Sequence, residues 1–299
     1  MLNFIIVAHK NPSQVLRLIN KLRGNDNKFF IHIDKGVKIE DFKDLIYGED
    51  IFYLKKRFHC IWGHYNQVLV TIAALSLVFN ISKNGKIVLL SGQCYPLKPI
   101  TKINTILCRN DGLSYMDIRV PDWKDFKRRT TEYRINFSNK RFDYIHLKTF
   151  NQHSIKLFIK GRINFLQLIR LLRPRRIDLE FRGGSNWWIL DFKTALRIYE
   201  YYQKNKLKLN SFFKHSHCPD EFFFQTIVYK IWGDDYINCF TDSLVYADWS
   251  RKGVYLPVTF EKDDFEQISS LPDKFLFARK FDSEKDSEIL EMIDENKKK

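Results

Sequence analysis

The sequence predicts an α/β protein in which a mainly parallel central sheet is flanked by helices. Two observations carry this prediction. Short apolar runs alternate with amphipathic helical patterns from residue 3 to residue 90, the order of strand–helix–strand units. Hydrophobic residues make up 44% of the 299 residues, enough for a sizeable core, and no repeat or clear linker divides the chain. We therefore expect a single domain over residues 1–282, followed by a charged tail over 283–299.

The first elements follow one another in this order. Residues 3–8 form a short apolar strand, and Asn11-Pro12-Ser13 opens a helix in which Pro12 suits a first-turn position. Gly24-Asn25-Asp26 ends that helix. Further strands are expected at 29–34, 51–55 and 86–90, and a helix at about 65–80.

The later part of the chain is less regular. From about 110 to 150 the pattern weakens and the charge rises, which indicates a loop-rich insertion. We expect a variable insertion over about 110–180 on the acceptor side of the site. A glycine turn at 182–186 precedes a strand at 187–190. Asp191 is placed to cap a helix through about 204, and a second helix is expected to start at Pro219. The charged tail after 282 is expected to fray.

Polar residues stand directly after three of the predicted strands. They are Ala8-His9-Lys10, Asp34-Lys35 and Ser91-Gly92-Gln93. Ligands of open α/β sheets bind at the carboxyl ends of the strands, so this rule alone selects the three segments as candidates for a binding site.

The chain is strongly basic, with 50 Lys and Arg against 35 Asp and Glu and a formal charge of +15. Such an excess favours an anionic partner, which leaves nucleic acid, acidic lipid headgroups or a phosphorylated small molecule. The basic residues are spread along the sequence and no recognised nucleic-acid module occurs, so we do not expect a nucleic-acid partner.

The cysteines and the N-terminus bear on the compartment. Five cysteines at irregular spacing, without a Cys-x-x-Cys pair, fit neither a disulfide framework nor a zinc site, and are typical of a reducing compartment. The start lacks the basic region of a signal peptide, and no apolar stretch approaches the roughly 20 residues that span a bilayer. We expect a cytoplasmic protein, soluble or peripheral at the inner face of a membrane.

The sharpest local signal is the run Cys218-Pro219-Asp220-Glu221. Proline followed by two acids is typical of a helix start, where the acids would complement the helix dipole. A carboxylate held rigidly at the edge of a pocket is also suited to accept a proton from a sugar hydroxyl. The pattern alone leaves both interpretations open.

A second signal places Arg279 and Lys280 between aromatic residues in the run Phe277-Ala-Arg-Lys-Phe-Asp282. The two cations would suit an anionic leaving group, or would form a solvated face over buried phenylalanine. No Asp-x-Asp pair, which many nucleotide-sugar enzymes use to hold a divalent cation, occurs in the chain. Such an enzyme would here neutralise the diphosphate with Lys and Arg, and we expect neither a metal nor another cofactor.

Two further segments are candidates for contacts with partners. Trp187-Trp188 could stack on a sugar ring, although one of two adjacent tryptophans is usually core. Residues 154–176 alternate Ile, Leu and Phe with Lys and Arg. This basic amphipathic run would suit an acidic membrane surface beside a lipid-linked acceptor, or a core helix with a charged outer face.

Taken together, the sequence resembles the Core-2/I-branching glycosyltransferases, glycosyltransferase family 14, which also holds the peptide O-xylosyltransferases. Seven runs occur in the order of that family and extend from residue 4 to residue 282, so chance is an unlikely source of the match. They are FIIVAHKNP at 4–12, FIHIDK at 30–35, WG at 62–63, LLSGQCYPL at 89–97, GSNWW at 184–188, CPDEF at 218–222 and LFARKFD at 276–282.

The resemblance implies a GT-A-like fold and an inverting, metal-independent transfer from a UDP-sugar. Glu221 corresponds to the family's catalytic base, and Lys280 to the cation that stabilises the leaving diphosphate. A second cation has no clean match, and Arg251, Lys252 or Arg279 could supply it. The remaining residues that the resemblance places at the site are His9 and Asp34 near the nucleotide, and Trp187, Trp188, Cys94 and Asp220 on the acceptor side.

One departure concerns Cys94, which stands where the family usually has Asp in the run S-G-Q-D-Y-P. The lost carboxylate changes the acceptor pocket or only a local hydrogen bond. The chain also lacks the membrane anchor of the animal Golgi enzymes, and with its short form it looks like a bacterial member that makes surface polysaccharide.

The expected function is the transfer of a sugar, GlcNAc in the first place, from a UDP-sugar to a glycan or lipid-linked saccharide. Two alternatives remain: a xylosyltransferase that uses UDP-xylose, and a non-catalytic glycan-binding module of a polysaccharide assembly complex. A binding module would tolerate the loss of Glu221, whereas an enzyme would not.

Overall fold

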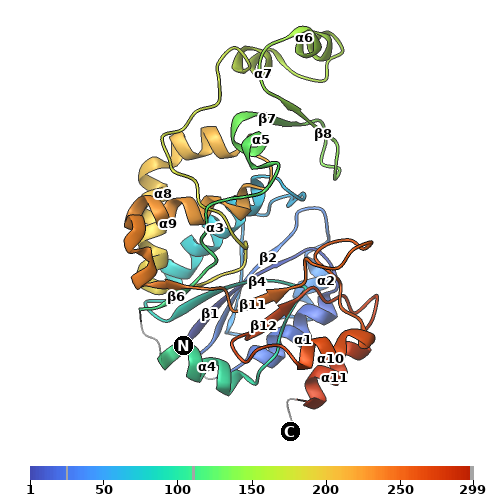
Figure 1. Ribbon diagram of the computed structural model, residues 1–299. Coiled ribbons are helices and arrows are strands. Elements are labelled where there is room, and N and C mark those ends of the chain that lie inside the picture. The colour runs from blue at the N-terminus through green and yellow to red at the C-terminus, as the bar shows by residue number, and fades with distance from the viewer. Residues whose placement is uncertain (25, 110–111, 297–299) are drawn as a thin grey trace.

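A seven-stranded sheet forms the centre of the molecule in the part of the chain that the computed structural model describes, residues 1–24, 26–109 and 112–296 (Figure 1). From one edge to the other, the strand order is β10-β6-β9-β4-β1-β2-β3. The strands are β1 (Leu2–Ala8), β2 (Lys28–Ile33), β3 (Ile51–Tyr53), β4 (Lys86–Ser91), β6 (Ser114–Tyr115), β9 (Ile189–Asp191) and β10 (Phe240–Thr241).

The sheet is mainly parallel, as predicted. Strand β1 pairs in parallel with β2 and β4, and β2 pairs in parallel with β3. Crossover helices connect these strands: α1 (Pro12–Leu22), α2 (Glu40–Lys43) and α3 (Asn66–Ile81). Only β9 runs against its neighbours β4 and β6. The predicted α/β class is therefore confirmed. The predicted turn that ends α1 includes Asn25, which lies outside the described residues.

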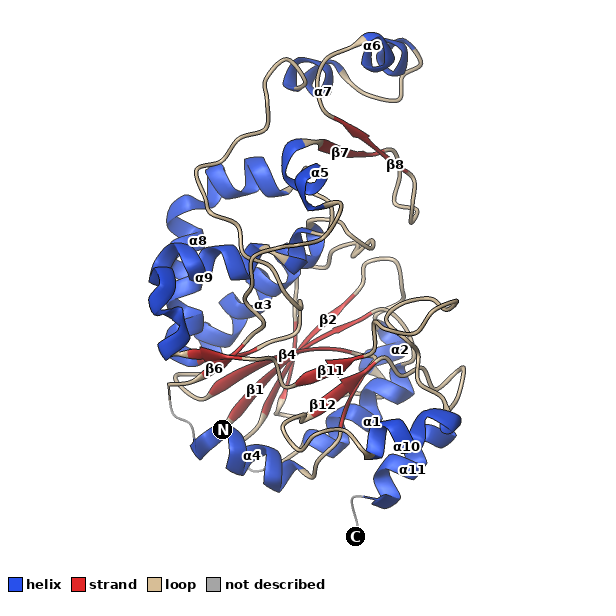
Figure 2. Cartoon of the chain, in the orientation of Figure 1, coloured by secondary structure: helices blue, strands red, loops and turns tan. Residues whose placement is uncertain are grey.

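Helices cover both faces of the sheet (Figure 2). Ile5 and Phe30 point to one face, where they pack in one cluster with α3, α8 (Phe192–Phe213) and α9 (Phe223–Trp232). Phe4 and Ile31 point to the opposite face, where they pack with α1 and α4 (Ile100–Arg109). Because side chains alternate along a strand, the almost wholly apolar strands β1, β2 and β4 supply both layers of the core.

A small second sheet carries the C-terminal part of the site. It has the order β11-β12-β5, with β11 (Val245–Ala247), β12 (Phe277–Arg279) and β5 (Cys94–Pro96). Behind it, α10 (Phe265–Ser269) and α11 (Glu288–Asn296) complete a separate apolar cluster. The expectation that the tail after 282 frays is wrong up to residue 296, because Ile289, Leu290 and Ile293 of α11 are buried. Residues 297–299 lie outside the described residues.

The segment from 112 to 180 has more regular structure than the predicted loop-rich insertion. After β6 it forms α5 (Phe126–Thr131), the hairpin β7 (Tyr133–Asn136) and β8 (Tyr144–Leu147), and the helices α6 (Gln152–Ile159) and α7 (Phe165–Arg170). Its own apolar cluster holds it together. Positions 110 and 111, at the start of the predicted insertion, lie outside the described residues.

The helices near the site differ in detail from the predictions. Asp191 caps α8, since its Oδ1 accepts a hydrogen bond from the Lys193 N–H at 3.0 Å. The helix runs past the expected end near 204 to Phe213, because Leu209, Phe212 and Phe213 are buried. Within the described residues, no helix is long and apolar enough to span a bilayer.

Candidate active site

Glu221 ends a short 3-10 turn, Pro219–Glu221, that precedes helix α9. The helix predicted from Pro219 therefore begins only at Phe223, because Phe222 has φ −148° and interrupts it. Cys218, with φ 46°, forms the sharp entry to the turn. Glu221 is thus presented ahead of the helix and is not one acid within its first turn.

Two glycine-containing segments fix this turn through backbone hydrogen bonds. The Gly63 carbonyl accepts from the Cys218 N–H at 3.0 Å, and the Gly184 N–H donates to the Glu221 carbonyl at 2.9 Å. A Cβ on Gly184 would lie 2.0 Å from the Asp117 carbonyl oxygen. Only glycine fits this close approach, so the predicted glycine turn acts as a support for the backbone of Glu221.

Arg129 of α5 holds the Glu221 carboxylate. Its Nη1 lies 2.5 Å from Oε2 of Glu221, and its Nε donates to Asp125 at 3.0 Å. The guanidinium also lies over the Trp123 ring, 4.9 Å from the centroid. The nearby Glu221 carboxylate, through charge and hydrogen bonding, raises the pKa of Arg129 despite its burial. No hydrogen bond to Oε1 of Glu221 is present among the described residues, so that oxygen can receive a proton.

Asp220 lies next to Glu221 in the same 3-10 turn. Burial and the charge of Glu221 raise the pKa of its carboxyl to about 7, although Arg129 and Arg134 oppose the shift. Its Oδ1 is buried without a hydrogen-bond partner among the described residues. A buried carboxyl beside a second one tends to keep its proton, so we expect Asp220 to be protonated more readily than an exposed Asp.

Arg279 interacts electrostatically both with the acidic residue Glu221 and with its cationic neighbour Lys280. It ends β12, opposite Cys94 in the register with β5, and its guanidinium lies over Trp187 at 4.6 Å from the ring centroid. Burial lowers the pKa of Arg279, while Cys94, Asp220 and Glu221 act in the other direction. Arg279 is therefore within electrostatic reach of both carboxylates.

Lys280 is half-buried beside other cations. Burial together with the charges of Arg279, Lys10 and Arg141 lowers its pKa. Lys10 itself pairs with Asp282, but among the described residues no acceptor lies within hydrogen-bond distance of the Lys280 ammonium. An unpaired, partly desolvated ammonium among cations is a ready site for an anion.

His9 and Asp34 lie at the ends of β1 and β2, as predicted. Burial, Lys10 and Lys280 lower the pKa of His9, so the ring borders the cationic group. The Asp34 carboxylate accepts from the Gly36 N–H at 2.7 Å and from the Cys60 N–H at 2.6 Å. It therefore fastens the loop after β3 to the end of β2.

The structure corrects two assignments made from the sequence, for Trp188 and Cys94, and gives Arg251 partners within the protein. Trp188 and Cys94 have no exposed surface and cannot touch an acceptor directly; Trp188 packs on Phe224, and Cys94 Sγ accepts from the Ser91 N–H. Arg251 is held by Asp264 at 2.7 Å and by Gln267 at 3.0 Å, so its charge is already compensated. Trp187 is half-buried and carries Arg279 on its ring.

Sequence reasoning missed Arg129 and Arg141, which both come from the segment 112–180. Arg141, in the loop between β7 and β8, lies over the Trp62 ring at 5.3 Å from its centroid and acts electrostatically on Lys280. The Arg-rich run at 128–129 was visible as charge, but no periodicity pointed to a partner for it.

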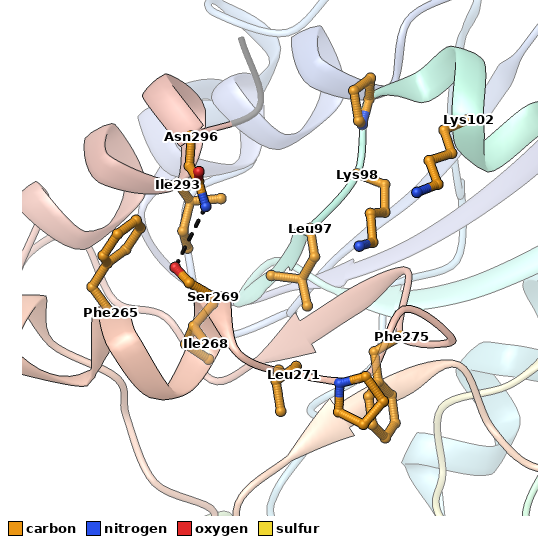
Figure 3. A pocket seen from close by; sticks show the side chains of 12 residues that line it. Leu97, Lys98, Lys102, Phe265, Ile268, Ser269, Leu271, Phe275, Ile293 and Asn296 are labelled. Carbon is orange, nitrogen blue, oxygen red and sulfur yellow. Dashed lines mark hydrogen bonds between the residues drawn. The ribbon is translucent and has the colours of Figure 1, made fainter. Parts of the chain in front are cut away.

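The site is distinct from the hollows of the surface. One, of about 240 Å³, lies among Leu97, Lys98, α10 and α11, and both apolar and polar side chains line it (Figure 3). Lys98 at its rim already pairs with Asp273. Another, of about 580 Å³, lies among α3, β7, α7 and the end of α8. Neither includes Glu221 or Lys280. Within the described residues, no three His, Cys, Asp or Glu side chains gather as metal ligands would.

A comparison with known proteins places this geometry in context. The model of the Core-2/I-Branching enzyme family matches residues 2–270. Xylosyltransferase 2 of Rattus norvegicus is 22% identical over 314 residues, which cover 97% of this chain and 33% of the rat protein. Xylosyltransferase 1 of Homo sapiens is 22% identical over 325 residues, with 97% and 30% covered. The chain thus spans about a third of the length of these curated relatives.

Solved structures were compared as well. The galactosyltransferase LgtC in complex with donor and acceptor sugar analogs superposes with a TM-score of 0.43 at 9% identity, covering 94% of this chain and 87% of that one. Mouse xyloside xylosyltransferase 1 in its apo form gives 0.39 at 10% identity, with 93% and 97% covered.

Proposed function

The chain belongs to the Core-2/I-branching enzyme family, and from this premise we propose that it is an inverting glycosyltransferase in which Glu221 is the catalytic base. One observation carries the proposal. A carboxylate with one oxygen free of hydrogen bonds lies within electrostatic reach of Arg279, and among the described residues the neighbouring Lys280 ammonium has no hydrogen-bond or ion-pair partner, although Asp282 acts on it electrostatically. A transferase needs both groups: a base that takes the proton of the acceptor hydroxyl, and a cation that stabilises the leaving diphosphate.

The proposed step is a single displacement. Oε1 of Glu221 takes the proton of an acceptor hydroxyl while that oxygen attacks the anomeric carbon of the donor sugar. The bond from that carbon to the diphosphate oxygen breaks, and its electron pair leaves with UDP. Attack from the side opposite to the leaving group inverts the anomeric configuration. The products are the new glycoside, UDP and a proton on Glu221.

Cations of the protein take the charge of the leaving diphosphate in this proposal. Lys280 is the primary contact and Arg279 the second cation, since Arg251 is already engaged by Asp264 and Gln267. His9 borders the same region. Fixed cations in a partly desolvated site stabilise a developing phosphate charge more strongly than cations in water. Transfer should therefore persist in EDTA; strict dependence on Mn²⁺ would overturn this part.

The proposed donor is a UDP-sugar. UDP-GlcNAc is the first candidate, on the sequence resemblance described above. The curated relatives at 21–25% identity are named xylosyltransferases, which makes UDP-xylose the second candidate. The proposed acceptor is a glycan hydroxyl. A screen of UDP-sugars for hydrolysis in the absence of acceptor separates the donors, because slow transfer to water reports only on the donor pocket.

The direct test of the function is Glu221→Gln. The amide keeps the shape and a hydrogen bond to the chain, but it cannot take the proton. Transfer should fall by about 100-fold or more, as for loss of a general base, while calorimetry shows unchanged UDP affinity. Full transfer activity of the Glu221→Gln variant would show that Glu221 is not the catalytic base. A glycan-binding module without catalysis would bind saccharide equally well in both forms and transfer nothing in either.

A further inference from the structure

The helices α6 and α7 lie at one extremity of the molecule, opposite the end that holds α4 and α11 (Figure 1), and their apolar side chains are exposed. We call this surface the α6–α7 face. Ile159 is 77% exposed, Leu166 72% and Phe165 60%. Other exposed apolar residues complete it: Phe150, Ile155, Phe158, Ile169 and Leu172. Eight exposed apolar side chains on two neighbouring helices and the residues beside them form the kind of patch that marks an interaction site.

The helices do not need this surface for their own packing. Leu157 of α6 and Leu168 of α7 already turn toward the hairpin β7–β8 and pack on a small cluster around Ile163 and Leu171. Both helices begin with a capping box, on Asn151 and Asn164 respectively. The outer apolar residues are therefore a second, unpartnered side of helices that are already held in place.

The charge around the face identifies its partner. Residues 144–177 contain eight Lys and Arg and no Asp or Glu. Lys148, Lys156, Lys160, Arg173 and Arg176 are exposed, whereas Arg175 is buried and holds the carbonyl of Phe212. Apolar side chains interleaved with cations, without a single acid, complement acyl chains and anionic headgroups. A folded protein partner would have to supply a matching set of carboxylates around an apolar centre.

We propose that the α6–α7 face docks on an anionic lipid bilayer, with Ile159 and Leu166 entering the acyl boundary and the lysines of α6 at the headgroups. These two residues flank the turn Lys160-Gly161-Arg162, which joins the helices. Such a protruding turn of two short helices can insert to shallow depth without a membrane-spanning segment.

The opposite side of the same segment borders the active site. Arg129, in the helix that leads into β7, contacts Glu221, and Arg141 between β7 and β8 acts on Lys280. A bilayer under the α6–α7 face would hold the site one small subdomain away from the headgroups. Resting on the proposed transferase function, this arrangement favours an acceptor saccharide carried on a lipid; the docking itself does not depend on that function.

Sedimentation with vesicles tests the docking on the full chain. The wild type should sediment with vesicles of phosphatidylcholine and phosphatidylglycerol, and at least about tenfold less with pure phosphatidylcholine. Ile159→Asp/Leu166→Asp should lose binding to both. Lys156→Glu/Lys160→Glu should lose the preference for phosphatidylglycerol. Leu207→Asp, at an 88% exposed position of α8, and Lys204→Glu/Lys208→Glu on the same helix are matched controls that should bind like the wild type.

Two binding results would overturn the proposal: no binding of the wild type to anionic vesicles, or a loss of vesicle binding in the α8 controls equal to that in the α6–α7 variants. A dimer in solution that Leu166→Asp dissociates would also overturn it, because a second copy of the chain would then cover the face. UDP-sugar hydrolysis in free solution is measured on every variant. It should stay at the wild-type rate, which shows that the variants fold. If the wild type binds vesicles but hydrolyses no UDP-sugar, the docking proposal stands and the proposed transferase function fails. The failure of one proposal can therefore be told from the failure of the other.

Discussion

Arg129 Nη1 lies 2.5 Å from Glu221 Oε2, although the two residues are 92 positions apart in the chain. Asp125 and the Trp123 ring hold the guanidinium in place, so the pair defines where the second carboxylate oxygen points. Because the Arg129 guanidinium contacts only Oε2, Oε1 of Glu221 stays free for the proposed uptake of the acceptor's proton.

The first prediction concerns this pair. Arg129→Ala should lower kcat by about 100-fold, because a displaced base loses its in-line contact with the acceptor hydroxyl. KM for the donor should change little. Arg129→Lys should recover part of the rate, since a charge without the fork geometry holds one contact. Steady-state kinetics check this, with Arg128→Ala, an exposed neighbour on α5, as the control. Equal effects of Arg128→Ala and Arg129→Ala would argue for a general effect of charge.

The second prediction concerns Lys280. Lys280→Ala should weaken UDP binding by about 10- to 100-fold, the usual range for loss of one charge-assisted contact. Lys252→Ala, in the exposed loop after β11, should leave it unchanged. Titration calorimetry with UDP measures both. If Lys252→Ala has the larger effect, the loop supplies the principal cation and the assignment of Lys280 fails.

The third prediction concerns pH. The pKa of Asp220 is raised to about 7 in the folded protein, so between about pH 4 and pH 7 the folded state holds a proton that the unfolded chain has released. The contribution of Asp220 to the free energy of unfolding is therefore greatest below about pH 4 and falls as the pH rises through 7. Asp220→Asn should be more stable relative to the wild type at about pH 8 than at about pH 5.

Urea unfolding of both proteins at the two pH values measures this difference. The exposed Asp122→Asn serves as the control and should show a difference from the wild type that does not grow with pH. A constant difference for Asp220→Asn as well would mean that Asp220 is ionised throughout this range.

The fourth prediction concerns the C-terminal helix. Leu290→Ala should cost about 2–5 kcal/mol of the free energy of unfolding, as for a buried leucine in a packed cluster. Glu291→Ala, on the exposed side of α11, should change it by less than about 0.5 kcal/mol. Chemical denaturation compares the two. Similar small effects would show that α11 contributes little to the fold.

Much of the fold could be predicted because its signals are local. The apolar strands from Leu2 to Ser91 alternate with helices, and this order dictates the parallel sheet. The tail was misjudged from its charge, although Ile289, Leu290 and Ile293 already have the spacing of a helix face. For Trp187 and Trp188, adjacent residues of an extended segment point to opposite sides, but the sequence does not tell which side is the core.

The residues of the candidate site also differ in whether local sequence signals could predict them. Glu221 and Lys280 belong to short runs that can be recognised in isolation. Arg129 could not be predicted, because its contact with Glu221 depends on how the segment 112–180 folds over the sheet, and α5 is only six residues long. The loss of a carboxylate at Cys94 was visible in the sequence. Only the register of β5 against β12 shows that Cys94 stands opposite Arg279.

The position of β12 between β5 and β11 has a consequence for biosynthesis. The strand that carries Arg279 is translated after both of the strands between which it is inserted. A nascent chain that has reached α9 contains the proposed base Glu221 and its partner Arg129, but it lacks Arg279 and Lys280, the two proposed contacts of the leaving group. The two halves of the proposed reaction therefore come together only once β12 has been made, so we expect a chain that stops before β12 to be catalytically silent.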